Sequence, residues 1–169
     1  MAKKMFTVNE HLSLVLEGGK TNIYVGGRLF QQCKYLLFNI PIKDYDLVDQ
    51  FGSIDQISER LSVDMDLVDN SLRVIFIPPE VEFWGHCSNL QAWYEQDYDT
   101  RLLHSSLAFP LLKELASLGD FLARRVFKEE IAKALKRGEE RVLTALIDKG
   151  YLGFLSRDEF WSVYPSESV

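Results

Sequence analysis

The sequence is poor in the residues that bind metals and form disulfides. It has two cysteines, Cys33 and Cys87, and three histidines among its 169 residues. No Cys-x-x-Cys or His-x-x-x-His spacing occurs, so the sequence offers no obvious zinc site. In the intracellular location that we predict, a disulfide between the two cysteines is not expected. We therefore expect neither a metal nor another cofactor.

Long hydrophobic runs are also missing. No apolar stretch approaches the roughly 18 residues that a membrane-spanning helix needs. The first residues carry two lysines but no apolar core of signal-peptide length. These absences predict a cytoplasmic protein without a membrane partner. The glycine pairs Gly18-Gly19 and Gly26-Gly27 lack the lysine and hydroxyl residue of a phosphate-binding loop, so we interpret them as turns.

Positive charge is scarce as well, since 19 lysines and arginines face 25 acids and leave a net charge of −6. This deficit argues against non-specific binding to bare nucleic acid. Residues 43–70 carry the whole net charge, whereas residues 120–137 have an excess of bases. An acidic face of this kind steers a protein toward a basic partner, although two solvated surfaces of opposite sign are the simpler alternative. The acids predicted to contact the partner are Asp44, Asp46, Asp49, Asp64, Asp66 and Asp69.

The first forty residues predict β-strands. Residues 11–17 and 21–25 each fit a strand, and 28–30 begin a third. The glycine pairs between them suit tight hairpin turns, which require positive φ. Residues 31–40 are apolar and fit either a buried strand or a short helix. Residues 72–77 are rich in β-branched side chains and predict a further strand.

From residue 44 the pattern changes to helices. Three capping boxes are predicted, beginning at Ser53, Ser88 and Ser156. For the second of these, the apolar stripe of Phe83, Cys87, Leu90 and Tyr94 favours a helix that starts earlier. Asp99 or Thr100 is expected to cap a helix that Pro110 kinks or restarts. Further helices are predicted over 120–138 and 139–149, each ended by a glycine. The fold class predicted is α+β, with an N-terminal antiparallel β-meander followed by a C-terminal helical bundle.

This pattern divides the chain into three parts. Residues 1–79 form a β-rich region that includes the acidic segment 43–70, residues 80–164 form the helical bundle, and residues 165–169 form a frayed tail. The bundle core is expected to bury Phe109, Leu111, Leu115, Phe127 and Ile131, which follow helical spacing.

Few side chains suggest catalysis. A nucleophilic thiol needs an imidazole beside it, and His86 and Cys87 are neighbours. Adjacent residues on a helix point about 100° apart, so His86 does not readily activate Cys87. His104 reaches Cys87 only through the fold. A cluster of charged residues lies at the predicted helix start that also contains His104. It comprises Asp97, Asp99 and Arg101, and it fits a cap with a local ion pair better than an acid–base site.

Aromatic and basic residues offer candidates for an interface. Tryptophan is enriched among the residues that anchor protein interfaces. We expect Trp84 and Trp161 to act in this way, with RNA contacted by Arg124, Arg125 or Lys128. A core role for the aromatic residues and a solvated helix face for the bases are the alternatives, since no aromatic residues are interleaved on that face for base stacking.

Four strings of sequence are distinctive: CSNLQAWY at 87–94, YDTRLLH at 98–104, LAFPLLK at 107–113 and VFKEEIA at 126–132. Together they resemble a helical module of poorly characterised archaeal proteins, which in some of them stands ahead of leucine-rich repeats. The resemblance implies an archaeal source and an interaction role, and it assigns no catalytic residue. A small acidic protein of this sort also looks like a ribosome-associated factor that dimerises or silences small subunits.

The sequence therefore predicts a non-enzymatic interaction protein. Its most specific expected partner is the small ribosomal subunit, where a basic ribosomal protein meets the acidic face and adjacent rRNA meets the bases. The exposed edge of the meander also predicts a homodimer through strand addition. The alternatives are an enzyme of unrecognised type that uses His86, Cys87 or His104, and a generic adaptor for another protein.

Overall fold

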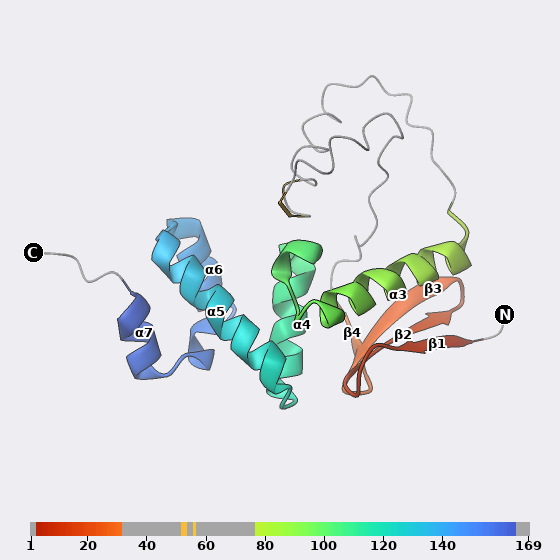
Figure 1. The fold of residues 1–169 in the computed structure, drawn as a ribbon, viewed down its shortest axis with the longest axis horizontal. Helices are drawn as coiled ribbons and strands as arrows, with labels where there is room; N and C mark the ends of the chain where they lie inside the picture. Colours follow the sequence, from red (N-terminus) through yellow and green to blue (C-terminus); the bar gives the residue numbers. More distant parts are fainter. Residues whose placement is uncertain (1–2, 32–51, 54–55, 57–76, 165–169) are drawn as a thin grey trace, which may run out of the picture.

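The computed structural model describes residues 3–31, 52–53, 56 and 77–164, and in these residues the fold is α+β as predicted (Figure 1). A four-stranded antiparallel sheet comes first, and helices follow it. The sheet and its covering helix lie at one end of an elongated molecule, α4 crosses the middle, and α5 to α7 lie at the other end.

The sheet is a simple meander with the order β1-β2-β3-β4. Its strands are β1 (Lys4–Thr7), β2 (Leu12–Glu17), β3 (Lys20–Val25) and β4 (Arg28–Phe30). The sequence prediction of the three later strands is confirmed, whereas β1 was not predicted. Both glycine pairs have positive φ at both positions, as the tight hairpin turns require. A Cβ added to Gly26 would lie 2.7 Å from a methyl carbon of Leu118, so a larger residue there would displace that exposed side chain.

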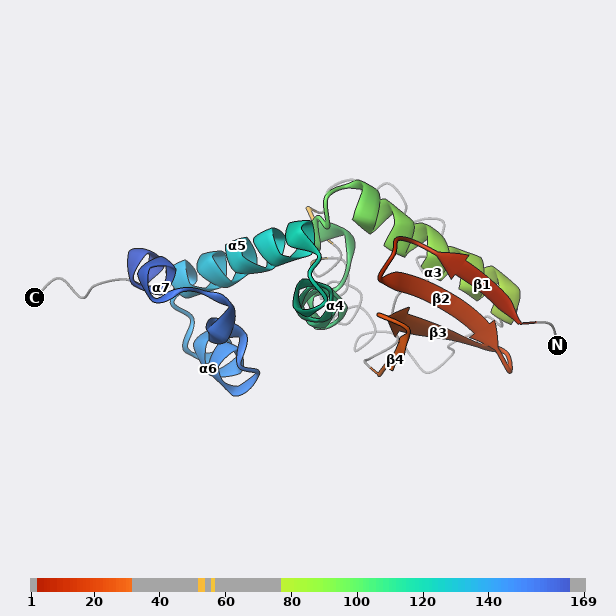
Figure 2. The same cartoon turned by 90° about the horizontal axis from the view of Figure 1, so that it is seen from below.

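Helix α3 (Pro79–Glu95) lies across one face of the sheet (Figure 2). Pro79 fits the first turn because it has no amide hydrogen to leave unpaired. From there Phe83, Cys87 and Leu90 follow helical spacing and are buried against the sheet, where Leu14 is also buried. The predicted capping box at Ser88 is wrong, since that residue lies inside the helix. The apolar stripe begins at Phe83, about one and a half turns before Ser88, and its packing on the sheet favours the earlier start of α3.

Two short corrections concern the next segment. Asp99 caps only a 3-10 turn, η2 (Thr100–Leu102), and the longer helix α4 (Ser105–Ser117) begins after it with His104 as its cap. Pro110 lies within α4 and does not restart it. It lies in the second turn of α4, past the first turn where proline is tolerated best, so it removes one intrahelical hydrogen bond without ending the helix.

The remaining elements follow the predicted signals closely. They are α5 (Phe121–Arg137), α6 (Glu140–Asp148), η3 (Tyr151–Phe154) and α7 (Arg157–Val163). Asp120 caps α5 through Ala123 N, and Gly138 ends that helix with φ of 66°. Ser156 and Glu159 form both bonds of the capping box that was predicted there.

A chain of hydrogen bonds joins the sheet to the helices. The side-chain amide of Asn9, in the β1–β2 turn, donates to the Tyr98 hydroxyl (2.8 Å), and that hydroxyl donates to Asp120 Oδ2 (2.5 Å). Tyr98 is fully buried. Burial raises the pKa of its hydroxyl, and the neighbouring Asp120 carboxylate raises it further, so Tyr98 remains a neutral donor.

One hydrophobic cluster runs through the whole molecule, from Leu12 of the sheet to Tyr151 of η3. Four of the five expected core residues, Leu111, Leu115, Phe127 and Ile131, are fully buried. Phe109 is only partly buried, because it lies at the margin of this core and lines a cleft.

Several predictions fall on other parts of the chain. The acidic partner residues, the segments 32–40 and 72–76, and the tail 165–169 lie outside the described residues. At the predicted capping box of 53–56, Gln56 N donates to Ser53 Oγ (3.4 Å), but the Gln56 side chain accepts from Gly52 instead of Ser53. Among the described helices, none combines the length and apolar character that crossing a bilayer requires.

The first prediction concerns the core. We expect Leu115→Ala to lower the free energy of unfolding by about 2–5 kcal/mol, because it leaves a cavity at a fully buried site. The matched control is Ile147→Ala, at a side chain that is 63% exposed, where a change within about 0.5 kcal/mol is expected. Urea denaturation measures both. Equal effects of the two substitutions would contradict the assigned core.

The second prediction concerns the Tyr98 hydroxyl. Tyr98→Phe should cost about 1–3 kcal/mol, because it leaves Asp120 Oδ2 and the Asn9 side chain without their common partner. Tyr94→Phe is the control, since no hydrogen bond joins the Tyr94 hydroxyl to the described residues. If the two variants have the same denaturation midpoint, the hydrogen-bond chain is not what joins sheet and helices.

Candidate binding cleft and the predicted site residues

An open cleft of about 810 Å³ lies where α4 and η2 approach α5, α6 and η3. One wall comes from Thr100 to Ser106, the other from the C-terminal half of α5 and from α6. Phe109 and Tyr151 form part of the base, and Ser53 also lines the cleft. A volume of this size lies within the range of small-ligand sites.

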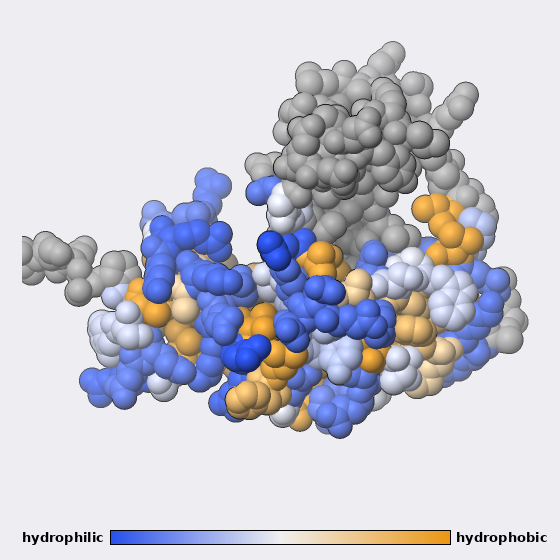
Figure 3. All heavy atoms as spheres, in the orientation of Figure 1, coloured by the Kyte–Doolittle hydropathy of each residue, from blue (hydrophilic) through white to orange (hydrophobic). Residues whose placement is uncertain are grey.

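Positive side chains dominate the lining. They are Arg101, Arg137, Arg141 and Lys149, against one carboxylate, Glu130. Figure 3 shows a mainly hydrophilic surface over α5 and α6 on the face in view. The cleft is therefore a local basic site in a chain whose net charge is negative.

Local turns place these cations. The left-handed Gly138 between α5 and α6 brings Arg137, the last residue of one helix, close in sequence and space to Arg141 in the first turn of the next. On the opposite wall, Asp99 binds Arg101 by accepting from Nε (2.9 and 3.0 Å) and from a terminal guanidinium nitrogen. These hydrogen bonds from Arg101 hold the pKa of the Asp99 carboxyl below its usual value.

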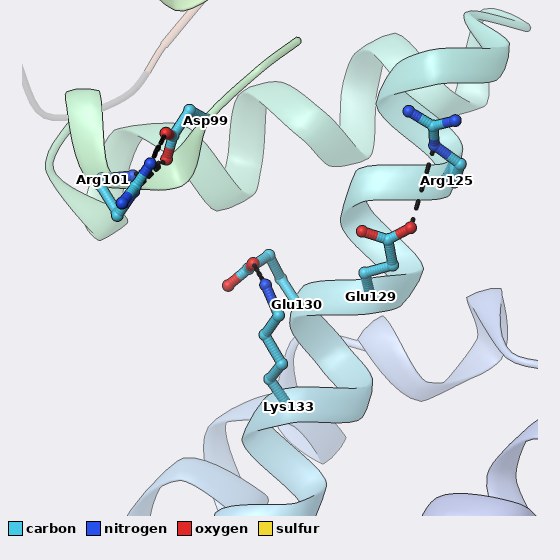
Figure 4. Close-up of polar contacts among 6 residues, drawn as sticks. All are labelled: Asp99, Arg101, Arg125, Glu129, Glu130 and Lys133. Atoms are coloured by element: carbon cyan, nitrogen blue, oxygen red, sulfur yellow. Dashed lines mark hydrogen bonds and ion pairs between the residues drawn. The ribbon is translucent and has the colours of Figure 1, made fainter. Parts of the chain in front are cut away.

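A second ion pair lies across from the first. Glu130 accepts from Lys133 Nζ (2.7 Å) one turn later on α5. Figure 4 shows this pair on α5 and the pair of Asp99 and Arg101 on a separate segment, with Arg125 and Glu129 nearer the start of α5. The one carboxylate that lines the cleft is thus already bonded to a cation.

The base of the cleft is aromatic and largely closed. Tyr151 packs against the rings of Phe109 and Phe127, at 6.4 and 5.1 Å between centroids, and Lys149 lies 5.9 Å from its ring centre. Burial raises the pKa of the Tyr151 hydroxyl, and the charge of Glu114 adds to the rise. Tyr151 is therefore a neutral, packed ring at the pH of the cell.

The structure gives no support to His86 and Cys87 as a reactive pair, which the sequence did not favour either. Cys87 is 1% exposed, and burial raises the pKa of its thiol to about 11. The neighbouring His86 is also buried, and its Nε2 donates to Glu82 Oε1 (3.1 Å). A buried neutral thiol has neither the charge nor the access of a nucleophile. The part of the chain that the structure describes also contains no group of His, Cys, Asp and Glu residues arranged to hold a metal ion.

His104 has a structural role and a position at the cleft. Its Nδ1 accepts from Ser106 N (3.2 Å) and lies 2.7 Å from Ser106 Oγ, so it caps α4. The ring is partly exposed and lines the cleft. His104 lies on the cleft wall, whereas Cys87 is buried in the core between α3 and the sheet.

The predicted partner residues are spread over the surface. Trp84 is 50% exposed and packs edge-on against Phe6 of β1, while Trp161 is 61% exposed on α7. Arg125 lies 3.9 Å from Glu129. Lys128 donates to both carboxylate oxygens of Glu159 (2.9 and 2.8 Å), and this bond lowers the pKa of Glu159 to about 2.

Sequence reasoning did not propose three of the basic residues that line the cleft as ligand-binding groups: Arg101, Arg141 and Lys149. It interpreted Arg101 as part of a helix cap. Arg141 and Lys149 lie in α6 and at its C-cap, outside the basic run 120–137. The only local signal was the high density of bases from Lys133 to Arg141 around Gly138. Their convergence with Arg101 depends on how α4 packs on α5.

The third prediction concerns Cys87. In a Cys33→Ser variant, the remaining thiol should react with Ellman's reagent about a hundredfold or more slowly in the native protein than in the unfolded chain, since it is buried and protonated. Rapid labelling of the native protein would restore Cys87 as a nucleophile candidate.

Comparisons with protein-family models, with curated proteins and with solved structures find no match to this chain. The resemblance to the archaeal helical module, and the functions that it implies, thus stay predictions.

Proposed function

We propose that this protein is a non-enzymatic interaction factor that binds the small ribosomal subunit and dimerises or silences it. One observation carries the non-enzymatic part. The cysteine and histidines with catalytic potential are buried or engaged in caps, whereas large aromatic side chains are exposed. This distribution suits a surface that recognises another macromolecule.

Two aromatic anchors support the protein interface. Trp161 belongs to a group of three rings on α7, with Phe160 at 5.3 Å and Tyr164 at 6.2 Å between centroids. The Lys128–Glu159 ion pair connects this helix to α5 and presents the rings at one end of the molecule. Trp84 forms a second exposed position beside β1.

The charges suit a ribonucleoprotein. Ribosomal proteins are basic, so the acids of 43–70 are proposed to meet one of them, and basic residues of α5 are proposed to meet adjacent rRNA. Of the bases named for this role, Arg124 forms no ion pair within the described residues, whereas Lys128 is bonded to Glu159.

The proposed homodimer would use the edge of the sheet. Among the strands that the structure describes, β1 pairs only with β2, and its outer backbone groups are proposed to pair with a second copy. Met5 on this strand is 64% exposed. A two-fold axis beside β1 would join two sheets into one.

The fourth prediction tests binding to the ribosome. Trp161→Ala should reduce co-sedimentation with archaeal small subunits by about tenfold or more, as loss of an interface anchor does, without changing the denaturation midpoint. Ile147→Ala, at an equally exposed apolar side chain on α6, should pellet as the wild type does.

Failure of the wild-type protein to pellet at about 0.1 M salt, where electrostatic attraction still acts over about 10 Å, would reject the ribosomal partner. Light scattering on the free protein tests the dimer separately. A monomeric mass at every concentration measured would reject strand addition.

A further inference from the structure

The cleft between η2, α5 and α6 carries positive charge that its own carboxylates do not neutralise. Glu130 is bonded to Lys133, and Arg101 is bonded to Asp99. Arg137, Arg141 and Lys149 form no ion pair within the described part of the chain. Within the described residues, these three cations line one cleft without counterions, so they repel one another, and an anionic ligand would relieve this repulsion.

The spacing of these cations indicates a ligand with several negative groups. Arg141 and Lys149 are eight residues apart along α6, which corresponds to about 12 Å along the helix axis. Arg137 lies beyond the Gly138 turn, at the end of α5. A single phosphate is too small to contact all three residues, so the ligand is expected to be a chain of anions.

The aromatic residues indicate how such a chain is recognised. Base stacking on a protein requires an accessible ring face. Tyr151 is 5% exposed and enclosed by Phe109 and Phe127, and it is not open to a base. Among the residues that line the cleft, the remaining ring systems are the partly buried Phe109 and His104. We therefore expect contacts from the cations to a phosphate backbone and not from stacked rings to base faces.

We propose that this cleft binds the phosphate backbone of single-stranded RNA without reading its sequence. The inference rests on the proposed function, because rRNA is the polyanion that a ribosome-associated factor meets. Arg137 and Arg141 supply planar guanidinium groups that match phosphate, and Lys149 supplies a point charge. An acidic protein segment is the competing ligand, because Ser53 of the acidic segment 43–70 lines the same cleft, and the competitors named below separate it from RNA.

This site differs from the bases proposed from the sequence. Arg124 and Arg125 lie in the first turns of α5, whereas the cleft uses the end of α5 and the whole of α6. Fluorescence anisotropy with a labelled oligouridylate of about 12 nucleotides, within the usual range of single-strand sites, measures binding to the full chain.

The test variant is Arg137→Gln with Arg141→Gln, two exposed positions near helix ends. The control, Lys20→Gln with Arg28→Gln, removes the same charge from exposed positions on β3 and β4 of the sheet, outside the cleft (Figure 1). We expect about tenfold or greater loss of affinity in the test variant and less than about twofold in the control. The slope of log Kd against log salt should fall by about 1.4 in the test variant, because two phosphate contacts are lost.

Three results would overturn the proposal: no binding of the oligonucleotide by the wild type at about 50 mM salt, equal losses in the two variants, or a salt slope that stays unchanged. Two competitors separate the ligand classes. Polyglutamate that displaces the RNA at equal charge concentration would assign the cleft to acidic protein, and uridine monophosphate that does so would assign it to a small nucleotide. Either result would reject the RNA proposal.

The same variants distinguish this failure from failure of the proposed function. If the wild type pellets with ribosomal subunits but does not bind the oligonucleotide, the cleft proposal fails alone. If the wild type binds the oligonucleotide through Arg137 and Arg141 but does not pellet, the ribosomal partner fails and the RNA site stands.

Discussion

The buried hydroxyl of Tyr98 joins the sheet to the helices by two hydrogen bonds. It accepts from Asn9 in the β1–β2 turn and donates to Asp120 at the start of α5. Asn9 also accepts from the amides of His11 and Leu12, and Asp120 also accepts from the amide of Ala123. Asn9 and Asp120 thus each hold a local backbone turn by hydrogen bonds and also bond to Tyr98. These bonds fix the sheet, the end of α3 and the start of α5 relative to one another.

The backbone around Tyr98 is shaped for this connection. Asp97 and Tyr98 both have positive φ, at 55° and 60°, which is uncommon for residues other than glycine. The Tyr98 amide donates back to the carbonyl of Trp93 and ends α3, and the reversal places the ring against Trp93 at 4.7 Å between centroids. The strain is offset by burial of a large ring and by two hydrogen bonds. Because this reversal sets where η2 and α4 begin, it also sets one wall of the basic cleft.

Sequence reasoning succeeded where one short segment contains its own explanation. Paired glycines specify hairpin turns through φ, Gly138 ends a helix for the same reason, and Ser156 and Glu159 satisfy each other's backbone donors. It failed where two local signals competed. Ser88 fits a capping box, yet the apolar stripe from Phe83 onward gains more by packing on the sheet, and the helix runs through. Asp99 is likewise a good cap, but only for the single turn of η2.

The sequence by itself determined the α+β class, the turns and most helix ends, because φ preferences, caps and hydrophobic spacing act over a few residues. Only the tertiary structure decided that Cys87 is an inert core thiol, since its pKa depends on what surrounds it. The basic cleft was likewise decided only by the tertiary structure. Arg101 and Arg137 are separated by 36 positions in the sequence and come to face one cavity because α4 packs against α5, a long-range contact that neither local segment encodes.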